Sequence, residues 1–411
     1  MLETKKKKIV NDPVHGFINI HFPLAFDIIE HSFFQRLRHI RQLGLTYLVY
    51  PGANHTRFQH ALGAMHLMAS AIEVLKAKGL EISEQEAEAA TAAILLHDIG
   101  HGPFSHSLEF SIAQGINHER IGHRLMREMD SQLNGRLAMA IDIFNDKYPK
   151  RFLHQLVSSQ LDVDRMDYLR RDSFFTGVTE GAIGSDRIIK MLNVVDDNLV
   201  VDAKGIYSIE KFLIARRLMY WQVYLHKTVV AAEQLLTQLL RRARELAEQG
   251  EEMYCSKSLL FFLKYKVTEA DFQQPFNANS ALYHFANIDD TDVLYAAKQW
   301  QHHPDKVLST LAKMVVARKL YKVELRNTPF SIEELSGKEK LFCQQFPELA
   351  NYKEYFVTTS SVSNNAYRST EESIQILYNN GKLIDIANAS DMLNTNVLSK
   401  NITKYFLCYV K

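Results

Sequence analysis

Residues 95–106 read LLHDIGHGPFSH and place three histidines and one aspartate directly after an apolar run. A buried helix face tolerates a carboxylate only when it is paired or bound to a metal ion. Gly100 and Gly102 follow at once and are typical of a helix end. At a helix end His97 and Asp98 can face one ion, whereas neighbours inside a helix diverge by about 100°. This stretch therefore predicts an apolar helix that ends at a metal site.

Two further apolar helices carry matching groups. His60 lies on the apolar stripe of a helix expected over residues 56–78, and Asp164 lies in a helix expected over residues 152–171. Two imidazoles and two carboxylates suit a divalent ion such as Mn, Fe, Ni, Zn or Mg. Taken alone, such a histidine is more often a hydrogen-bonded core residue, and such an aspartate a solvated one. Together they predict one metal site, with the ligands His60, His97, Asp98 and Asp164.

Hydrophobic periodicity predicts a mostly α-helical fold with short β-hairpins and a small α+β C-terminal lobe. Ser83 and Glu86 form the capping-box pattern that opens an apolar helix over residues 83–98. Further segments are expected as a hairpin over 8–22, helix over 23–44, a hairpin over 193–209, helices over 210–249, and mixed helices and strands beyond 250. We expect a core over residues 1–230 and a second lobe over residues 231–411.

The composition excludes several classes of protein. The 411 residues carry a net charge of about +1, so the chain as a whole does not attract nucleic acid or membranes. The three cysteines, Cys255, Cys343 and Cys408, lack the spacing of a metal site or a disulfide framework. No apolar segment follows the basic N-terminus, and no run is long enough to span a membrane. These features predict a cytoplasmic protein that makes no use of a membrane.

Three motifs, RFQHALG, LLHDIGHGPFSH and LDVDRMDYLRRD, occur in the order of the HD-domain phosphohydrolase signature, which this chain resembles. NDPVHGFINIH, FQRLRHIRQLG and YPGANHTRFQHALG extend the resemblance to the deoxynucleoside triphosphate triphosphohydrolases. The similarity covers residues 8–230. It implies the same four metal ligands and a helical HD core. It also implies hydrolysis of a dNTP to deoxynucleoside and triphosphate, with metal-bound hydroxide attacking the α-phosphorus.

The resemblance implies that His101, His106 and His118 line the phosphate-facing side of the site. His106 is a suitable general acid for the leaving oxygen, and Glu109 lies one helical turn further on. His118 completes the expected relay. The alternative for His118 is a role at a helix cap.

Substrate contacts follow from the same resemblance. The triphosphate is expected to contact Arg57, Arg165 and Arg216, each of which taken alone could be a surface charge. The sugar and base are expected to contact Gln42, Leu43, Tyr168, Asp172 and Tyr224. A site with no room or partner for a 2′-hydroxyl group selects deoxyribose. Without the family, the tyrosines would be interpreted as core aromatics.

Regulation by an activating (d)NTP, with assembly into a homotetramer or dimer, is also implied. The matching positions are Lys8, Asn11, Glu30, Gln35, Arg38, His226 and Lys227. In the vertebrate members of that family, an aspartate stands where this chain has Glu30 and an arginine where it has Gln222, so the nucleotide specificity is expected to differ. In related enzymes lobes like residues 231–411 form the oligomer interface.

Two other functions remain open. Another HD-type nucleotidase or phosphodiesterase would use the same metal ligands without needing three arginines for a triphosphate. A nucleotide sensor or nucleic-acid-binding protein would keep the metal for structure alone. The basic run RRARE at 241–245 is the only feature that favours nucleic acid, and no aromatic stacking pattern accompanies it.

Overall fold

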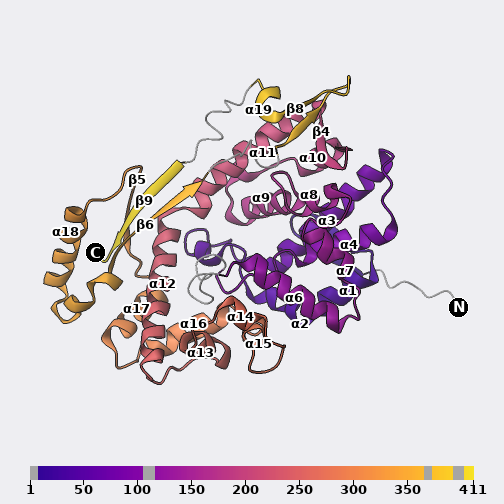
Figure 1. The fold of residues 1–411 in the computed structure, drawn as a ribbon. Helices are drawn as coiled ribbons and strands as arrows, with labels where there is room; N and C mark the ends of the chain where they lie inside the picture. The colour runs from indigo at the N-terminus through magenta and orange to yellow at the C-terminus, as the bar shows by residue number, and fades with distance from the viewer. Residues whose placement is uncertain (1–7, 105–115, 365–372, 392–401) are drawn as a thin grey trace.

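The structure is a computed structural model that describes residues 8–104, 116–364, 373–391 and 402–411. Helices dominate it, and short strands lie at its edges (Figure 1). The expectation of a mostly α-helical fold with a small α+β C-terminal part is confirmed. The expected general acid His106 and its partner Glu109 lie outside the described residues.

The first half of the described chain is helical after one hairpin. In order, its main elements are β1 (Lys8–Asp12), β2 (Gly16–Ile20), α1 (Pro23–Glu30), α2 (Ser32–Gln35), η1 (Arg36–His39), η2 (Gly44–Leu48), α3 (Arg57–Ala77), α4 (Glu84–Leu96), α6 (His118–Gln132), α7 (Ala138–Phe144), α8 (Arg151–Val157), α9 (Val163–Thr176) and α10 (Ser185–Met191). 

The second half mixes helices and strands. Its main elements are β3 (Leu192–Val195), β4 (Asn198–Asp202), α11 (Ile206–Met219), the π-helical turn η5 (Tyr220–Tyr224), α12 (Lys227–Glu248), α13 (Lys257–Lys264), α14 (Glu269–Phe272), α15 (Ala281–Ala286), α16 (Asp290–Trp300), α17 (Lys306–Val316), β5 (Lys322–Arg326), α18 (Ile332–Gln345), β6 (Val357–Asn364), β7 (Gln375–Leu377), β8 (Leu383–Asp385), α19 (Ile386–Ala389) and β9 (Ile402–Tyr409).

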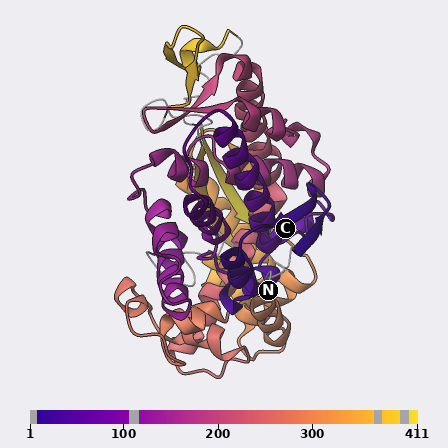
Figure 2. The ribbon, with the colours of Figure 1, turned by 90° about the vertical axis from the view of Figure 1, so that its right-hand side faces the viewer.

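The N-terminal helices α1, α3, α4, α6 and α7 lie together on one side of the molecule, the side of the N-terminus (Figure 1). Figure 2 shows β7 and β8 in yellow at one end of the molecule, and the orange helices α13 to α16 at the opposite end. The antiparallel sheet β5–β9–β6 and helix α18 lie on the side away from the N-terminus (Figure 1). A second sheet, ordered β3–β4–β7–β8, joins two distant parts of the chain through a parallel pair between β4 and β7.

Most predicted helices form close to their expected bounds, because strong local signals fix their ends. Ser83 accepts a hydrogen bond from the backbone N–H of Glu86, and the Glu86 carboxylate accepts from the N–H of Ser83, as the capping box requires. The expected hairpin near the N-terminus also forms, with Lys8 opposite Ile20 and Asp12 opposite Gly16.

Three predicted boundaries are wrong. The helix expected over 152–171 is two helices, because residues 158–162 leave the helix and the Asp162 side chain caps the start of α9. The hairpin expected over 193–209 ends at Asp202, after which helix α11 begins. The helix expected over 23–44 breaks at His31, whose extended backbone separates α1 from α2.

The expected division between residues 230 and 231 stays a prediction, and α12 runs through it without a break. No helix among the described residues is long and apolar enough to cross a bilayer. All three cysteines are free.

A short segment at the start of α16 is attached to the chain around residues 99–104, in part through Arg36. The buried guanidinium of Arg36 donates to the carbonyl oxygens of Ile288, Ile99 and His101 at 3.2, 2.7 and 3.0 Å. We call Ile288, Asp289 and Asp290 the α16 anchor. Through it, an element far along the chain fixes the backbone that follows Asp98.

Asp290 supplies the second half of this attachment. Its carboxylate accepts the backbone N–H groups of Arg41 and Phe104 at 3.0 and 2.8 Å. Burial raises the pKa of Asp290 to about 6, against the opposing effect of these two hydrogen bonds.

This carboxylate should make stability depend on pH. An aspartate whose pKa is higher in the folded protein than in the unfolded chain favours folding at low pH, and loses that effect as the pH rises from about 4 to about 6. The free energy of unfolding of the wild type, relative to Asp290→Asn, should therefore fall by about 2 kcal/mol between pH 4.5 and 7. Urea unfolding of both proteins at the two pH values measures the difference. A constant difference would contradict the raised pKa.

Candidate metal centre and pocket

Three of the four predicted metal ligands converge on one point. Nε2 of His60 on α3 lies 3.0 Å from Oδ1 of Asp164 in the first turn of α9. Nε2 of His97, the residue that caps α4, lies 3.4 Å from the same oxygen and 3.3 Å from the Nε2 of His60. These three atoms all lie within 4.8 Å of one another. Two imidazoles and a carboxylate at this spacing fit a divalent ion.

The other ring nitrogen of each histidine is already held. Nδ1 of His60 lies 2.8 Å from Oδ2 of Asp167, and Nδ1 of His97 lies 2.6 Å from the carbonyl oxygen of Ile94. An imidazole that donates from Nδ1 presents the lone pair of Nε2, and such partners are typical of histidines that bind metals. Both rings are therefore oriented to present Nε2 at the shared point.

The charges at this point are strongly coupled. Burial would lower the pKa of His60, but hydrogen bonds with Asp164 and Asp167 outweigh it and raise the pKa to about 10. Burial would raise the pKa of Asp164, but His97 and His60 hold it below its ordinary value. Because a metal ligand must be deprotonated, ion binding would release a proton from these histidines.

Asp98, the fourth predicted ligand, lies beside the cluster. Its carboxylate oxygens are 3.5 Å from Nε2 of His97 and 3.8 Å from Nε2 of His60. Oδ2 also accepts a hydrogen bond from Nη1 of Arg57, and Oδ1 lies 3.3 Å from Nδ1 of His101. Asp98 therefore faces the same space as the three converging ligands, with Arg57 as its cationic partner, and its role as a ligand stays a prediction.

Gly100 allows helix α6 to pack against this turn. A Cβ atom at Gly100 would overlap the carbonyl oxygen of His118 and the backbone of Gly122. The close approach places the His118 ring 3.9 Å from the His101 ring, centroid to centroid. Two of the predicted catalytic histidines therefore lie together, next to Asp98.

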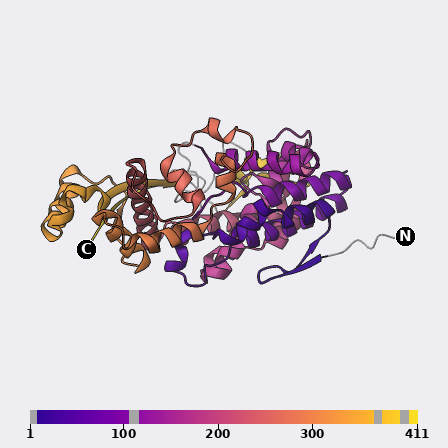
Figure 3. The ribbon, with the colours of Figure 1, turned by 90° about the horizontal axis from the view of Figure 1, so that it is seen from below.

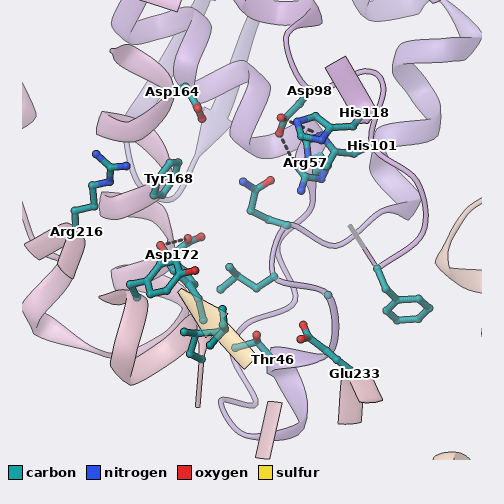
Figure 4. A pocket seen from close by; sticks show the side chains of 18 residues that line it. Thr46, Arg57, Asp98, His101, His118, Asp164, Tyr168, Asp172, Arg216 and Glu233 are labelled. Carbon is teal, nitrogen blue, oxygen red and sulfur yellow. Dashed lines mark hydrogen bonds and ion pairs between the residues drawn. The ribbon is translucent and has the colours of Figure 1, made fainter. Parts of the chain in front are cut away.

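A pocket of about 530 Å³ lies beside the cluster, and its walls come from distant parts of the chain. Of the three converging ligands, Asp164 lines it, whereas His60 and His97 do not. Figure 4 shows Arg57, Asp98, His101 and His118 at one end, and Thr46 and Glu233 at the other. Predicted site residues that line it are Gln42, Leu43, Arg57, Asp98, His101, His118, Asp164, Tyr168, Asp172, Arg216 and Tyr224. Residues that were not predicted but also line it are Gly44, Thr46, Phe104, Tyr220, Leu225, Glu233 and Val362.

Asp172 is held in place before any ligand arrives. Its carboxylate accepts from Tyr224 Oη at 2.8 Å, and its other oxygen lies 2.7 Å from Nε2 of His55. His55 is buried and stacks on Phe175 at 4.6 Å between ring centroids. Its place in YPGANHTRFQH offered a signal, but we predicted no role for it.

Arg165 is placed differently from the other predicted phosphate ligands. It forms an ion pair with Asp162, three residues before it on α9, and is absent from the pocket lining. Arg216 on α11 does line the pocket.

The predicted regulatory residues form local pairs. Nζ of Lys8 lies 3.7 Å from a carboxylate oxygen of Glu30, and Nε of Arg38 donates to Gln35 at 2.7 Å. Asn11 is exposed on β1. At the start of α12, His226 accepts a hydrogen bond from the N–H of Thr228, and Lys227 is exposed. Gln222, in η5, donates to Glu180 at 3.2 Å. Their regulatory role stays a prediction.

Loss of the shared carboxylate should remove the metal. Asp164→Asn would leave two imidazoles and the predicted ligand Asp98, and we expect bound Mn²⁺ to fall at least tenfold, measured by elemental analysis after dialysis. Asp162→Asn is the matched control, because it lies two residues away and an asparagine still caps the helix. Equal metal content in Asp164→Asn and the wild type would exclude Asp164 as a ligand.

Comparison with known proteins agrees with this geometry. A family model for the HD domain matches residues 57–172, and one for the HD associated region matches residues 183–258. The crystal structure of a phosphohydrolase from Bacteroides thetaiotaomicron is similar with a TM-score of 0.94 and 54% identity, covering 99% of this chain and 100% of that one. The uncharacterized protein YwfO of Bacillus subtilis is 31% identical over 99% of this chain and 93% of its own length.

Named triphosphohydrolases match over a smaller part. The human deoxynucleoside triphosphate triphosphohydrolase SAMHD1 is 32% identical over 59% of this chain and 45% of its own length. The Dictyostelium discoideum homologue is 31% identical over 62% of this chain and 54% of its own length. This chain thus spans about half of those relatives. The matched HD segment contains His60, His97 and Asp164, and the chain belongs to the HD-domain phosphohydrolases.

Proposed function

We propose that this protein is a metal-dependent triphosphohydrolase that converts a dNTP to deoxynucleoside and triphosphate. The observation that carries the proposal is that Asp164 of the His60–His97–Asp164 cluster lines one pocket together with groups suited to both ends of a nucleotide. The similarity to enzymes that carry this name over residues of the HD core supports the same substrate class.

The phosphate end of the pocket lies beside the cluster. The proposed ligands of a divalent ion are His60, His97, Asp164 and Asp98. Bound there, the ion would lower the pKa of a water molecule and polarise the α-phosphate. Arg57 and Arg216 supply positive charge for the phosphate oxygens. His101 and His118 lie next to Asp98 and are positioned to hold or pass a proton at the phosphate, with His106 proposed as the acid.

The nucleoside end is defined by Asp172 and the two tyrosines around it. Because His55 and Tyr224 fix the Asp172 carboxylate, it is oriented to accept a hydrogen bond from a 3′-hydroxyl group. The Tyr168 and Tyr224 rings lie 6.3 Å apart and give this wall an aromatic surface against the sugar. Gln42 and Leu43 also line the pocket and are proposed to contact sugar and base.

Ion identity, assembly and activation belong to the proposal as well. Mn, Fe, Ni, Zn and Mg all suit the donor set. An activating (d)NTP bound at Lys8, Asn11, Glu30, Gln35, Arg38, His226 and Lys227, and a homotetramer or dimer, follow from the family resemblance alone. Sedimentation with and without nucleotides tests both.

One observation favours a different hydrolase of the same family. Arg57 is paired with Asp98 and Arg165 with Asp162, so two of the three predicted phosphate-binding arginines already have carboxylate partners. A nucleotidase or phosphodiesterase acting on a substrate with fewer phosphates would need fewer cations. This second candidate predicts release of orthophosphate or a monophosphate rather than triphosphate.

A product assay separates the two. Protein with Mn²⁺ or Mg²⁺ would be incubated with each dNTP, and with all four plus GTP, before anion-exchange separation. Deoxynucleoside with intact triphosphate is the expected result. Stepwise phosphate release would favour the nucleotidase, and no turnover in any mixture would favour a sensor.

The Tyr224 hydroxyl should contribute to binding of the sugar. Tyr224→Phe removes one hydrogen bond to Asp172, so we expect KM for the preferred dNTP to rise about five- to tenfold, the equivalent of roughly 1 kcal/mol. Tyr207→Phe is the control, since Tyr207 is an exposed residue of α11. Steady-state kinetics of both variants provide the measurement, and an unchanged KM in Tyr224→Phe would contradict the role of Asp172.

A further inference from the structure

A chain of buried charged residues connects the N-terminal hairpin to the metal centre. Nη1 and Nη2 of Arg171 donate to the two carboxylate oxygens of Asp12 at 2.8 and 3.2 Å. The same guanidinium donates to both oxygens of Asp167, from Nε at 2.8 Å and from Nη2 at 3.1 Å. Asp167 in turn holds Nδ1 of His60. Asp12 therefore acts on a ligand of the proposed ion through two intermediates.

The hairpin turn makes a second contact with the same carboxylate. His15, between β1 and β2, places Nε2 2.6 Å from Oδ1 of Asp167. Asp12 also accepts the backbone N–H groups of Val14 and His15 at 2.9 Å each, which fixes the turn. One hairpin thus supplies two of the groups that surround Asp167 and Arg171.

We propose that the N-terminal hairpin is part of the metal centre, with Asp12, Arg171 and Asp167 as positioning residues that set the affinity of His60 for the ion. This inference rests on the proposed metal centre and goes beyond it, because it assigns a role to a surface element that contributes no ligand. Docking of the hairpin and binding of the ion are then linked, and each strengthens the other.

Burial explains why the three charges must act together. Arg171 and Asp167 are fully buried, and Asp12 is 8% exposed. Removing one partner of a buried ion pair leaves the other charge without compensation, whereas the complete set is stable. Without Asp12, Arg171 would shift toward Asp167 or toward water, and the hydrogen bond that orients His60 would change with it.

Helix α3 leaves room for this network at Gly63. A Cβ atom there would overlap Oδ1 of Asp167 and Nη2 of Arg171. Gly63 lies three residues after His60, so it is on the same side of the helix. A larger side chain would disturb the network without removing any of its charges.

The hairpin depends on this attachment. A two-stranded ribbon is marginal on its own in water. Its outer residues Ile9 and Phe17 are 59% and 69% exposed, while Ile18 and Ile20 pack into the core. Figure 3 shows the indigo hairpin along the outside of the helical core. Besides these two isoleucines, the Lys8–Glu30 ion pair and a hydrogen bond from Arg170 to the carbonyl of Val14, the buried polar contacts of Asp12 and His15 tie the hairpin to the protein.

The test measures ion affinity, not turnover. Full-length protein freed of metal by chelation would be titrated calorimetrically with Mn²⁺, and the Co²⁺-loaded protein examined by absorption spectroscopy. Asp12→Asn should bind Mn²⁺ about tenfold more weakly and change the Co²⁺ spectrum, within the 10–100-fold range of outer-shell substitutions. Hydrogen exchange of residues 9–19 should slow on adding Mn²⁺ to the wild type, and not to Asp12→Asn.

Two further variants keep the result unambiguous. Asp305→Asn is the matched control, since it also breaks an ion pair, with Arg242, in helices remote from the cluster, and it should bind Mn²⁺ as the wild type does. Gly63→Ala should weaken Mn²⁺ binding at least as much as Asp12→Asn, which tests the network if Asp12→Asn fails to fold.

The outcomes separate this inference from the proposed function. Wild-type affinity in Asp12→Asn or Gly63→Ala would overturn the coupling and leave the metal centre intact. An equal loss in Asp305→Asn would overturn it too, because general destabilisation would then explain the effect. A wild type that binds neither Mn²⁺ nor Co²⁺ would remove the metal centre and this inference together.

Discussion

The site depends on the buried carboxylate of Asp167, which does not lie at the point where His60, His97 and Asp164 converge. Asp167 accepts hydrogen bonds from Arg171 and holds Nδ1 of His60 and Nε2 of His15. Burial alone would raise its pKa, but Arg171 and the two histidines hold the pKa well below its ordinary value, so the group stays ionised. Its carboxylate holds Nδ1 of His60 and so orients the ring. The helices α3 and α9 and the N-terminal hairpin all meet at this residue.

Much of this arrangement could be predicted from sequence because local signals carry it. Capping residues and apolar stripes marked α3 and α4, and the three converging ligands each ended or lined an apolar face. Asp167, the partner of His60, was not predicted, although it follows Asp164 by about one helical turn and Arg171 follows it by another. That spacing indicates a shared face, but not which residues pack against it. His15 is 152 residues away along the chain, and only the tertiary fold brings it to Asp167.

Two residues that line the pocket could not be predicted from the sequence either. Glu233 on α12 and Val362 on β6 complete a pocket lining whose other residues lie between Gln42 and Leu225. Neither residue belongs to a motif, because a pocket lining imposes only shape and charge, and many sequences satisfy both. The break in the helix expected over 152–171 was missed for a related reason. A short loop between two amphipathic helices can preserve the apolar periodicity on both sides, and only the cap at Asp162 marks it.

The α16 anchor has a consequence for how this enzyme can diverge. Arg36 and Asp290 bind the backbone of residues 99–104 through carbonyl and amide groups, which every amino acid possesses. These contacts therefore fix the path of the turn without restricting its side chains, whereas the packing of α6 restricts Gly100. The HD segment over residues 57–172 contains this backbone but neither Arg36 nor Asp290. Substitutions at the start of α16, more than a hundred residues beyond this segment, could therefore alter catalysis without changing any group that lines the pocket. The part of the chain that determines the activity is thus larger than the domain that defines the family.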